Sequence, residues 1–285
     1  MKALIVGSNG QLGRGLIGSA PADVEIVGHD IDTLDVTDRA AVDAIIAVEQ
    51  PNLVFNAAAY TAVDKAESDQ QLAEAVNATA VGLLANAARR QGASFVHVST
   101  DFIFDGLSGL PYAPDASPNP LSVYGQTKLA GERAAGDDAL IVRTAWVYAP
   151  QGDNFVRTML RLMAERPEVR VVADQVGTPT YAPDLARVLW QLAEQRQRGV
   201  FHYTDAGAAS WYDFAVAIQE EALAAGLLQA AVPIIPIPTT AYPTPARRPS
   251  YSVLDKEATW AALGRVAPHW RQNLRVMLQH LQAAG

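Results

Sequence analysis

The sequence predicts an α/β fold in which helices cover both faces of a parallel sheet. Three observations lead to this prediction: short apolar runs alternate with helical stretches, a glycine-rich turn follows the first run, and the alternation loosens after about Tyr148. The apolar runs are near-continuous, as is typical of strands buried on both faces. Alternating strands and helices predict βαβ units with right-handed crossovers. We therefore expect a doubly wound sheet of the Rossmann type with a smaller C-terminal domain.

The strands of the first half are short and rich in β-branched or aliphatic residues. Between the third and fourth of them, Leu72–Arg90 is long enough and rich enough in Ala and Leu to predict a helix. The strands are expected at Lys2–Val6, Val24–Gly28, Leu53–Ala57, Phe95–Ser99 and Leu140–Thr144.

The second half has longer helical segments and a proline-rich stretch. Val232–Pro249 contains six prolines and cannot form an interior helix. We expect one domain of residues 1–150 and 185–206 and a second of residues 151–184 and 207–285. The segments behind this division are helices at Asn154–Glu165, Asp184–Gln195, Trp211–Ala225 and His269–Gln282 and a strand at Val200–Tyr203.

The composition excludes several classes of protein. With no cysteine among 285 residues, disulfides, thiolate zinc sites and a cysteine nucleophile are excluded, and we expect a cytoplasmic location. The five histidines lack the spacing of metal ligands, so no metal site is expected. A net charge of −8 argues against a nucleic-acid partner. Every apolar run is too short to span a membrane.

The turn Gly7-Ser8-Asn9-Gly10-Gln11-Leu12-Gly13 follows the first strand and opens the first helix. Gly7 permits the tight turn, Gly10 lets the backbone approach a pyrophosphate, and Gly13 lets helix and strand pack closely. The free N–H groups at the start of a helix bind phosphates. We therefore expect this turn, including Asn9, Gln11 and Leu12, to bind a nicotinamide dinucleotide; an ordinary glycine-rich turn is the alternative.

Acidic residues follow the second strand, at the distance where a dinucleotide site places a carboxylate on the adenosine ribose. Asp30 is the candidate, and it favours NADH because a carboxylate repels a 2′-phosphate. Asp35 and Val36 are expected to flank the adenine. The alternative is that these acids only solvate a loop. Arg14 could instead meet a 2′-phosphate, so the choice between NADH and NADPH stays open.

Tyr124 and Lys128 are four residues apart at the start of a predicted helix, which places them on one face. A nearby cation is expected to lower the pKa of a phenol and suit it to acid–base catalysis. Such a pair is common on helix surfaces, but Ser99-Thr100-Asp101 precedes it at the end of the fourth strand, where doubly wound sheets bind ligands. A hydroxyl there can hold a substrate carbonyl, so the combination predicts hydride transfer.

The sequence resembles the dTDP-4-dehydrorhamnose reductase family within the extended short-chain dehydrogenases, over nearly the whole chain. The motifs that carry the resemblance are Gly7–Gly13, Asn56–Glu67, Val76-Asn77, Ser99–Gly106, Tyr124–Glu132, Arg143–Tyr148, Asp174–Thr180 and Arg248-Pro249. The resemblance implies reduction of the 4-keto group of a dTDP-linked 6-deoxyhexose, with NADPH or NADH, to give dTDP-L-rhamnose.

The resemblance also assigns residues. It implies that Thr100, Tyr124 and Lys128 are catalytic, with Tyr124 and Lys128 also contacting the cofactor. Asn56, Ala57, Ala58 and Tyr60 would lie along the cofactor. The substrate would contact Thr61, Asp101, Phe102, Trp146, Asn154, Gln175 and Arg248. For Arg248 the alternative is a structural ion pair, although arginine suits a diphosphate through bidentate bonds.

One departure and two alternatives accompany this interpretation. Some family members form a dimer through magnesium held by glutamates, but Gly13-Arg14-Gly15 has no carboxylate. A homodimer therefore fits the sequence and a magnesium-linked one is not expected. The first alternative function is a reductase or epimerase acting on another nucleotide sugar. The second is a non-catalytic, reductase-like regulatory subunit, against which the intact Thr100, Tyr124 and Lys128 argue.

Overall fold

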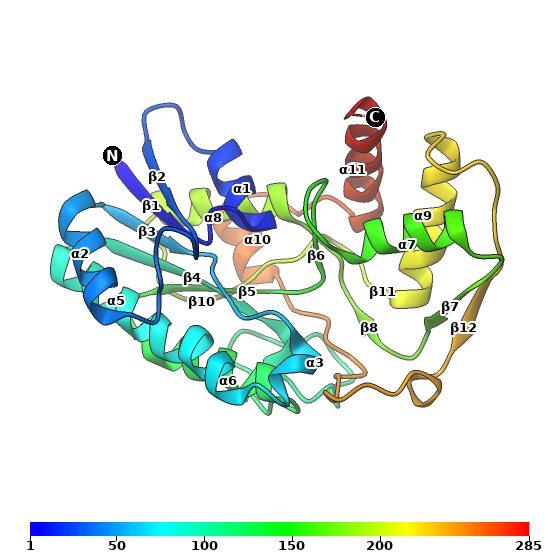
Figure 1. The fold of residues 1–285 in the computed structure, drawn as a ribbon, viewed down its shortest axis with the longest axis horizontal. Coiled ribbons are helices and arrows are strands. Elements are labelled where there is room, and N and C mark those ends of the chain that lie inside the picture. The colour runs from blue at the N-terminus through cyan, green and yellow to red at the C-terminus, as the bar shows by residue number, and fades with distance from the viewer. Residues whose placement is uncertain (285) are drawn as a thin grey trace.

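A computed structural model describes residues 1–284 and confirms the predicted fold class. Within these residues the central sheet has six parallel strands, and each predicted strand lies within one residue of its observed bounds at either end. The order reverses between β1 and β3, which is the switch point of the sheet (Figure 1). In spatial order the strands are β10 (Gly199–His202), β5 (Leu140–Thr144), β4 (Ser94–Thr100), β3 (Leu53–Asn56), β1 (Lys2–Val6) and β2 (Glu25–His29).

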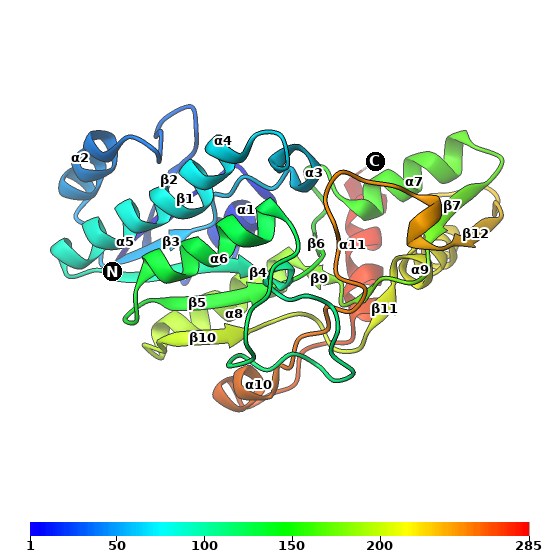
Figure 2. The same ribbon diagram turned by 90° about the horizontal axis from the view of Figure 1, so that it is seen from below.

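Helices cover both faces of this sheet (Figure 2). In β1, Leu4 and Val6 belong to one buried cluster and Ala3 and Ile5 to another, as a strand buried on both faces requires. The first face is covered by α2 (Arg39–Glu49), α5 (Ala80–Gln91) and α6 (Val123–Ala135). The second is covered by α1 (Gln11–Gly18), α8 (Ala182–Glu194) and α10 (Glu257–Leu263).

The helix predicted over Leu72–Arg90 is present but not uniform. It comprises α4 (Gln70–Glu74), a π-helical turn (Ala75–Thr79) and α5. A short helix, α3 (Val63–Ala66), precedes it. Such π-turns frequently occur at functional sites, and this one carries the buried Asn77.

The remaining elements form a smaller body at one end of the sheet (Figure 1). Its core cluster includes side chains of α7, α9 and α11, and the short strand pairs here were not predicted. The helices are α7 (Phe155–Glu165), α9 (Trp211–Ala224) and α11 (Trp270–Ala284). The strand pairs are β6 (Val147–Tyr148) with β9 (Thr180–Tyr181), β7 (Val169–Val172) with β12 (Ile234–Ile237), and β8 (Val176–Gly177) with β11 (Ala209–Ser210).

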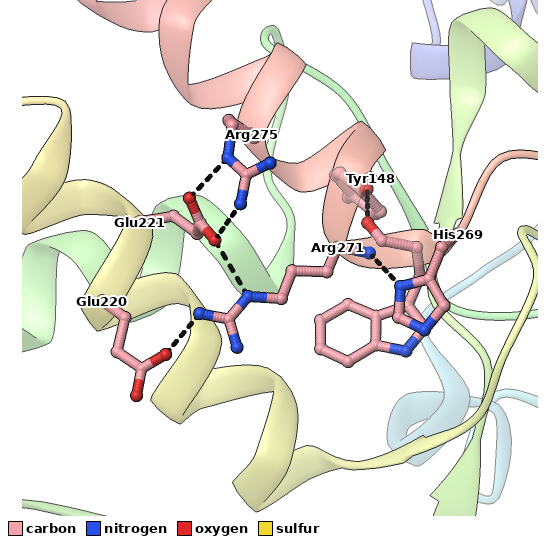
Figure 3. A network of polar contacts seen from close by, with 7 residues as sticks. Tyr148, Glu220, Glu221, His269, Arg271 and Arg275 are labelled. Atoms are coloured by element: carbon pink, nitrogen blue, oxygen red, sulfur yellow. Dashed lines mark hydrogen bonds and ion pairs between the residues drawn. The ribbon is translucent and has the colours of Figure 1, made fainter.

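Charged side chains join α9 to α11 beside this core (Figure 3). Arg275 holds the largely buried Glu221 through two contacts of 2.8 Å, and Arg271 bonds both Glu221, at 2.9 Å, and Glu220. These arginines hold the pKa of the Glu221 carboxyl below its usual range, Arg275 having the larger effect. The carboxylate thus keeps its charge and ties the last helix to the smaller body.

One helix does not follow the proposed division of the chain into two domains. Helix α10 lies in the range 207–285 but packs against α8 and β10 of the sheet. The chain therefore returns to the sheet before α11 begins. No helix within residues 1–284 combines the length and apolarity needed to cross a membrane.

Candidate active site

The glycine-rich turn joins β1 to α1 at the switch point of the sheet. Gly7 has a left-handed φ of 82°, and a Cβ there would meet the backbone of Ala58 at 2.6 Å. A Cβ on Gly13 would lie 2.1 Å from the Gly7 carbonyl oxygen. Gly10 is less crowded and caps α1. Gly7 and Gly13 are thus required by the backbone itself, and the turn is pressed against the loop that follows β3.

Asp30 lies at the end of β2 and contacts this turn. Its carboxylate accepts hydrogen bonds from the backbone N–H groups of Asn9, at 2.8 Å, and Ile31, at 2.9 Å. Arg14 donates to the Asn9 carbonyl at 2.8 Å, so an acid and a base flank the same turn. Both are exposed.

Asp35 and Val36 lie further along this loop. The Asp35 carboxylate accepts bonds from the backbone and hydroxyl of Thr37, at 2.9 and 2.7 Å, and these bonds lower its pKa. Val36 packs against the cluster beneath α2 and α5. Asp35 therefore caps a local turn, and its place beside the adenine stays a prediction.

The segment after β3 is held by two buried amide side chains. Asn56 accepts from the Ala58 N–H at 3.2 Å and contacts His97 Nδ1 of β4 at 3.2 Å. Asn77 accepts from the Tyr60 N–H at 2.9 Å and donates to the Tyr60 carbonyl at 3.1 Å. These bonds fix the path of residues 56–60 along the edge of the sheet.

The three predicted catalytic side chains lie close together on β4 and α6. Thr100 ends β4, and its hydroxyl lies 3.1 Å from Asp101 Oδ1. Tyr124 occupies the first turn of α6, which Ser122 caps through the Gly125 N–H. Lys128 lies one turn further and donates to the Val98 carbonyl at 2.7 Å. All three are buried, and Phe102 packs edge-on against the Tyr124 ring at 5.5 Å.

The expected direction of the Tyr124 pKa is wrong. Burial raises the pKa of Tyr124 to about 12, bonding to Thr100 opposes the rise, and the Asp101 charge adds to it. Lys128 does not lower it, because its ammonium points to the Val98 carbonyl. Burial also lowers the pKa of Lys128 to about 8 against an opposing effect of Glu132. At neutral pH the phenol therefore holds its proton.

Aromatic side chains border the open side of this group. Trp146 has a left-handed φ of 47°, lies over Gly177 and stacks on Trp211 with the ring centroids 3.5 Å apart. A small cavity of about 30 Å³ separates Trp146 from Phe102 and has room for one or two water molecules. Asp101 is buried beside it, and burial raises its pKa to about 6. Thr61 is exposed on the loop after β3.

A larger cavity of about 770 Å³ lies in the smaller body. Its lining includes the side chains of Trp211 and Tyr242. Gln175 and Arg248 line both this cavity and the smaller one. Gln175 is buried and donates to the Thr239 hydroxyl at 3.0 Å. The cationic side chains around the larger cavity are Arg166, Arg170 and Arg248.

Two contacts join the sheet to the smaller body across the site. Asn154 caps α7 and donates to Gln11 of the glycine-rich turn at 3.0 Å. Arg248 forms a bidentate ion pair with Asp64 of α3, at 2.8 and 3.0 Å. The structural ion pair considered for Arg248 is therefore present, while the side chain also lines both cavities.

Several residues that build this site were given no role in it from the sequence, although Asn77 and Glu67 lie in motifs that carry the family resemblance. Asn77 links Tyr60 to Thr127 of α6, and the Glu67 carboxylate accepts from the Val123 N–H at the start of that helix, at 2.9 Å. His97 is fully buried between Asn56 and Lys128. An amide inside an apolar helical pattern was a usable signal for Asn77, whereas Glu67 and His97 look ordinary in the sequence.

Thr100 and the glycine-rich turn lie at the carboxyl ends of parallel strands, where ligands bind in doubly wound sheets. A phenol, a hydroxyl and an amine at the same edge of the sheet as a glycine-rich turn are typical of oxidoreductases of the short-chain dehydrogenase type. Residues 1–283 match the family described as RmlD substrate binding domain. The chain belongs to the dTDP-4-dehydrorhamnose reductase family, as its motifs had predicted.

Three relatives show how close this relationship is. The dTDP-4-dehydrorhamnose reductase of Burkholderia thailandensis is 43% identical, with 99% of each chain covered. A crystal structure of a dTDP-4-dehydrorhamnose reductase from Clostridium acetobutylicum has a TM-score of 0.93 at 41% identity, covering 99% of this chain and 100% of that one. The Bacillus anthracis enzyme in complex with NADP has a TM-score of 0.93 at 34% identity, covering 98% and 99%.

Proposed function

We propose that this enzyme uses NADPH or NADH to reduce the 4-keto group of dTDP-4-dehydrorhamnose, giving dTDP-L-rhamnose. The observation that carries the proposal is the meeting of Thr100, Tyr124 and Lys128 at the end of β4, at the same edge of the sheet as the glycine-rich turn that follows β1. The names of the relatives support the substrate. The NADP in the Bacillus anthracis structure supports the cofactor class.

The glycine-rich turn fits a dinucleotide. Side chains at Gly7 and Gly13 would collide with backbone, so the turn stays bare and close to the sheet. The first N–H groups of α1 and the positive end of its dipole suit a pyrophosphate. Asp30 would bond ribose hydroxyls and Arg14 would compensate a 2′-phosphate, roles that their hydrogen bonds to the same turn support.

The side chains of the site supply the proton and fix the ketone. When bound, the cofactor supplies the hydride. Because the pKa of Tyr124 is about 12, its phenol is protonated at neutral pH and can give a proton to the oxygen at C4. The Thr100 hydroxyl donates a second hydrogen bond to that oxygen. Lys128 would bond the nicotinamide ribose, and to stabilise the tyrosinate that remains its ammonium would have to turn away from the Val98 carbonyl.

The two cavities suggest where the substrate lies. We place the nucleotide and its diphosphate in the cavity of about 770 Å³, among Arg166, Arg170 and Arg248. The sugar then points toward Tyr124 between Phe102 and Trp146, with Asp101, Thr61, Asn154 and Gln175 around it. A hexose is far larger than the 30 Å³ present there, so Trp146 or its neighbours must shift on binding.

The remaining sequence-based expectations enter this proposal unchanged. We retain a dinucleotide-binding domain of residues 1–150 and 185–206 and a substrate domain of residues 151–184 and 207–285, with α10 packed on the first. A homodimer and a cytoplasmic location remain predictions.

The test is turnover of reduced cofactor with dTDP-4-dehydrorhamnose, together with the variant Tyr124→Phe. Without its proton donor the variant should lose ~10²–10⁴-fold in kcat. Its affinity for NADPH, measured by fluorescence titration, should stay within about twofold because the ring remains. Tyr212→Phe is a matched control, since Tyr212 lies in α9 outside the residues that line either cavity.

The alternatives predict other results. An epimerase would interconvert nucleotide sugars without net loss of reduced cofactor. A regulatory subunit would bind cofactor and show no turnover with any keto sugar. Near-normal kcat in Tyr124→Phe would remove this residue from the mechanism.

A further inference from the structure

Arg248 is held from the sheet side by a residue that lines neither cavity. Asp64 of α3 accepts from Arg248 Nη1 at 3.0 Å and from Nη2 at 2.8 Å. It also accepts from the Ala246 N–H at 3.2 Å, so one carboxylate holds both the guanidinium and its backbone segment. Asp64 lies outside the lining of both cavities, whereas Arg248 belongs to both.

The donors of Arg248 are only partly used. Nη1 has three acceptors for its two hydrogens: Asp64, the Thr244 hydroxyl at 2.5 Å and the Ala246 carbonyl at 3.2 Å. Both of its hydrogens are therefore used. Nη2 gives one hydrogen to Asp64. A guanidinium has five N–H donors. Within residues 1–284 the Nε hydrogen and the second Nη2 hydrogen have no acceptor, and these two share one edge of the planar group.

That edge has the geometry for two oxygens of one phosphate. An ion pair at one edge and a ligand at the other are therefore compatible. Asp64 and Thr244 fix the plane of the guanidinium before any ligand arrives, so less side-chain entropy is lost on binding.

We propose that Asp64 is a positioning residue for nucleotide recognition: it holds Arg248 from behind so that its Nε–Nη2 edge binds the diphosphate of the nucleotide sugar. The proposal rests on the proposed function for the identity of the ligand. It extends recognition of the substrate to α3, a helix of the sheet side, although the cavity lies in the smaller body.

Simple electrostatics predicts the opposite result. A carboxylate near a diphosphate repels it, so removing the Asp64 charge should strengthen binding. Positioning predicts weaker binding, because Arg248 then has to be ordered when the ligand arrives. The sign of the change separates the two.

The experiment measures the Kd of dTDP by calorimetry on the full-length protein. Asp64→Asn should weaken dTDP binding by about 2- to 10-fold, the range for immobilising one flexible side chain. Thr244→Val removes another contact of Nη1 without changing charge and should act in the same direction. Asp137→Asn is the control, because Asp137 is exposed on the loop after α6 and lines neither cavity.

A double-mutant cycle completes the test. In an Arg248→Ala background, Asp64→Asn should no longer change the Kd, since the residue it positions is gone. Unchanged or tighter dTDP binding in Asp64→Asn would overturn the proposal, as would full additivity with Arg248→Ala. If dTDP binding follows these expectations but no keto sugar is reduced, the proposed function fails while the role of Asp64 stands.

Discussion

The ionisation of Lys128 predicts a basic limb in the pH profile of the enzyme. Burial lowers the pKa of this ammonium to about 8, against an opposing effect of Glu132. Its depressed pKa means that the charged form is lost as the pH rises through 8. About a tenth of the molecules would keep the Lys128 charge at pH 9, and the charged fraction would fall about tenfold with each further pH unit. Tyr124 cannot produce this limb, because its pKa is about 12.

The measurement is kcat/KM for NADPH from pH 6.5 to 9.5 at saturating nucleotide sugar. This quantity reports ionisations of the enzyme form that NADPH binds. Lys128→Arg keeps the charge throughout the range, so its plateau should be lower but its basic limb absent. Asp101, with a pKa of about 6, titrates on the acid side and leaves this limb clear. A flat wild-type profile to pH 9.5, or an unchanged limb in Lys128→Arg, would refute the reasoning.

Two further predictions concern the cofactor turn. If Asp30 bonds the adenosine ribose, Asp30→Ala should weaken NADH more than NADPH in fluorescence titrations; equal losses would show that it does not distinguish them. Gly13→Ala would place a Cβ 2.1 Å from the Gly7 carbonyl oxygen, so we expect a loss of about 1–3 kcal/mol in urea unfolding and weaker NADPH binding. Gly18→Ala, in the same helix with no atom within 4 Å, is the matched control and should not lose stability.

The sheet could be predicted because its signals are local. Runs such as Lys2–Val6 and Leu140–Thr144 are mostly apolar and do not alternate with polar residues, which is the pattern that burial on both faces of a sheet produces. The turn from Gly7 to Gly13 could also be predicted from the sequence. Backbone contacts leave no room for a side chain at Gly7 or Gly13, so the sequence shows glycine at both positions. Tyr124 and Lys128 needed only the spacing of a helix.

The smaller body could not be predicted in the same way. Its strands β6, β8, β9 and β11 are two residues long, too short for any periodic pattern to mark them. The direction of the Tyr124 pKa was missed because it depends on burial and on where the Lys128 side chain points, and the spacing of the two residues determines neither.

Side chains from the sheet and from the smaller body pair with each other across the site. Gln11 was assigned to the cofactor and Asn154 to the substrate, yet the two side chains bond each other at 3.0 Å. Asp64 and Arg248 are likewise paired across 184 positions of sequence. A substitution on either side of such a pair alters the partner on the other. We therefore expect the Gln11–Asn154 pair to couple cofactor affinity to substrate affinity, and the role of each residue to depend on its partner as much as on the domain that carries it.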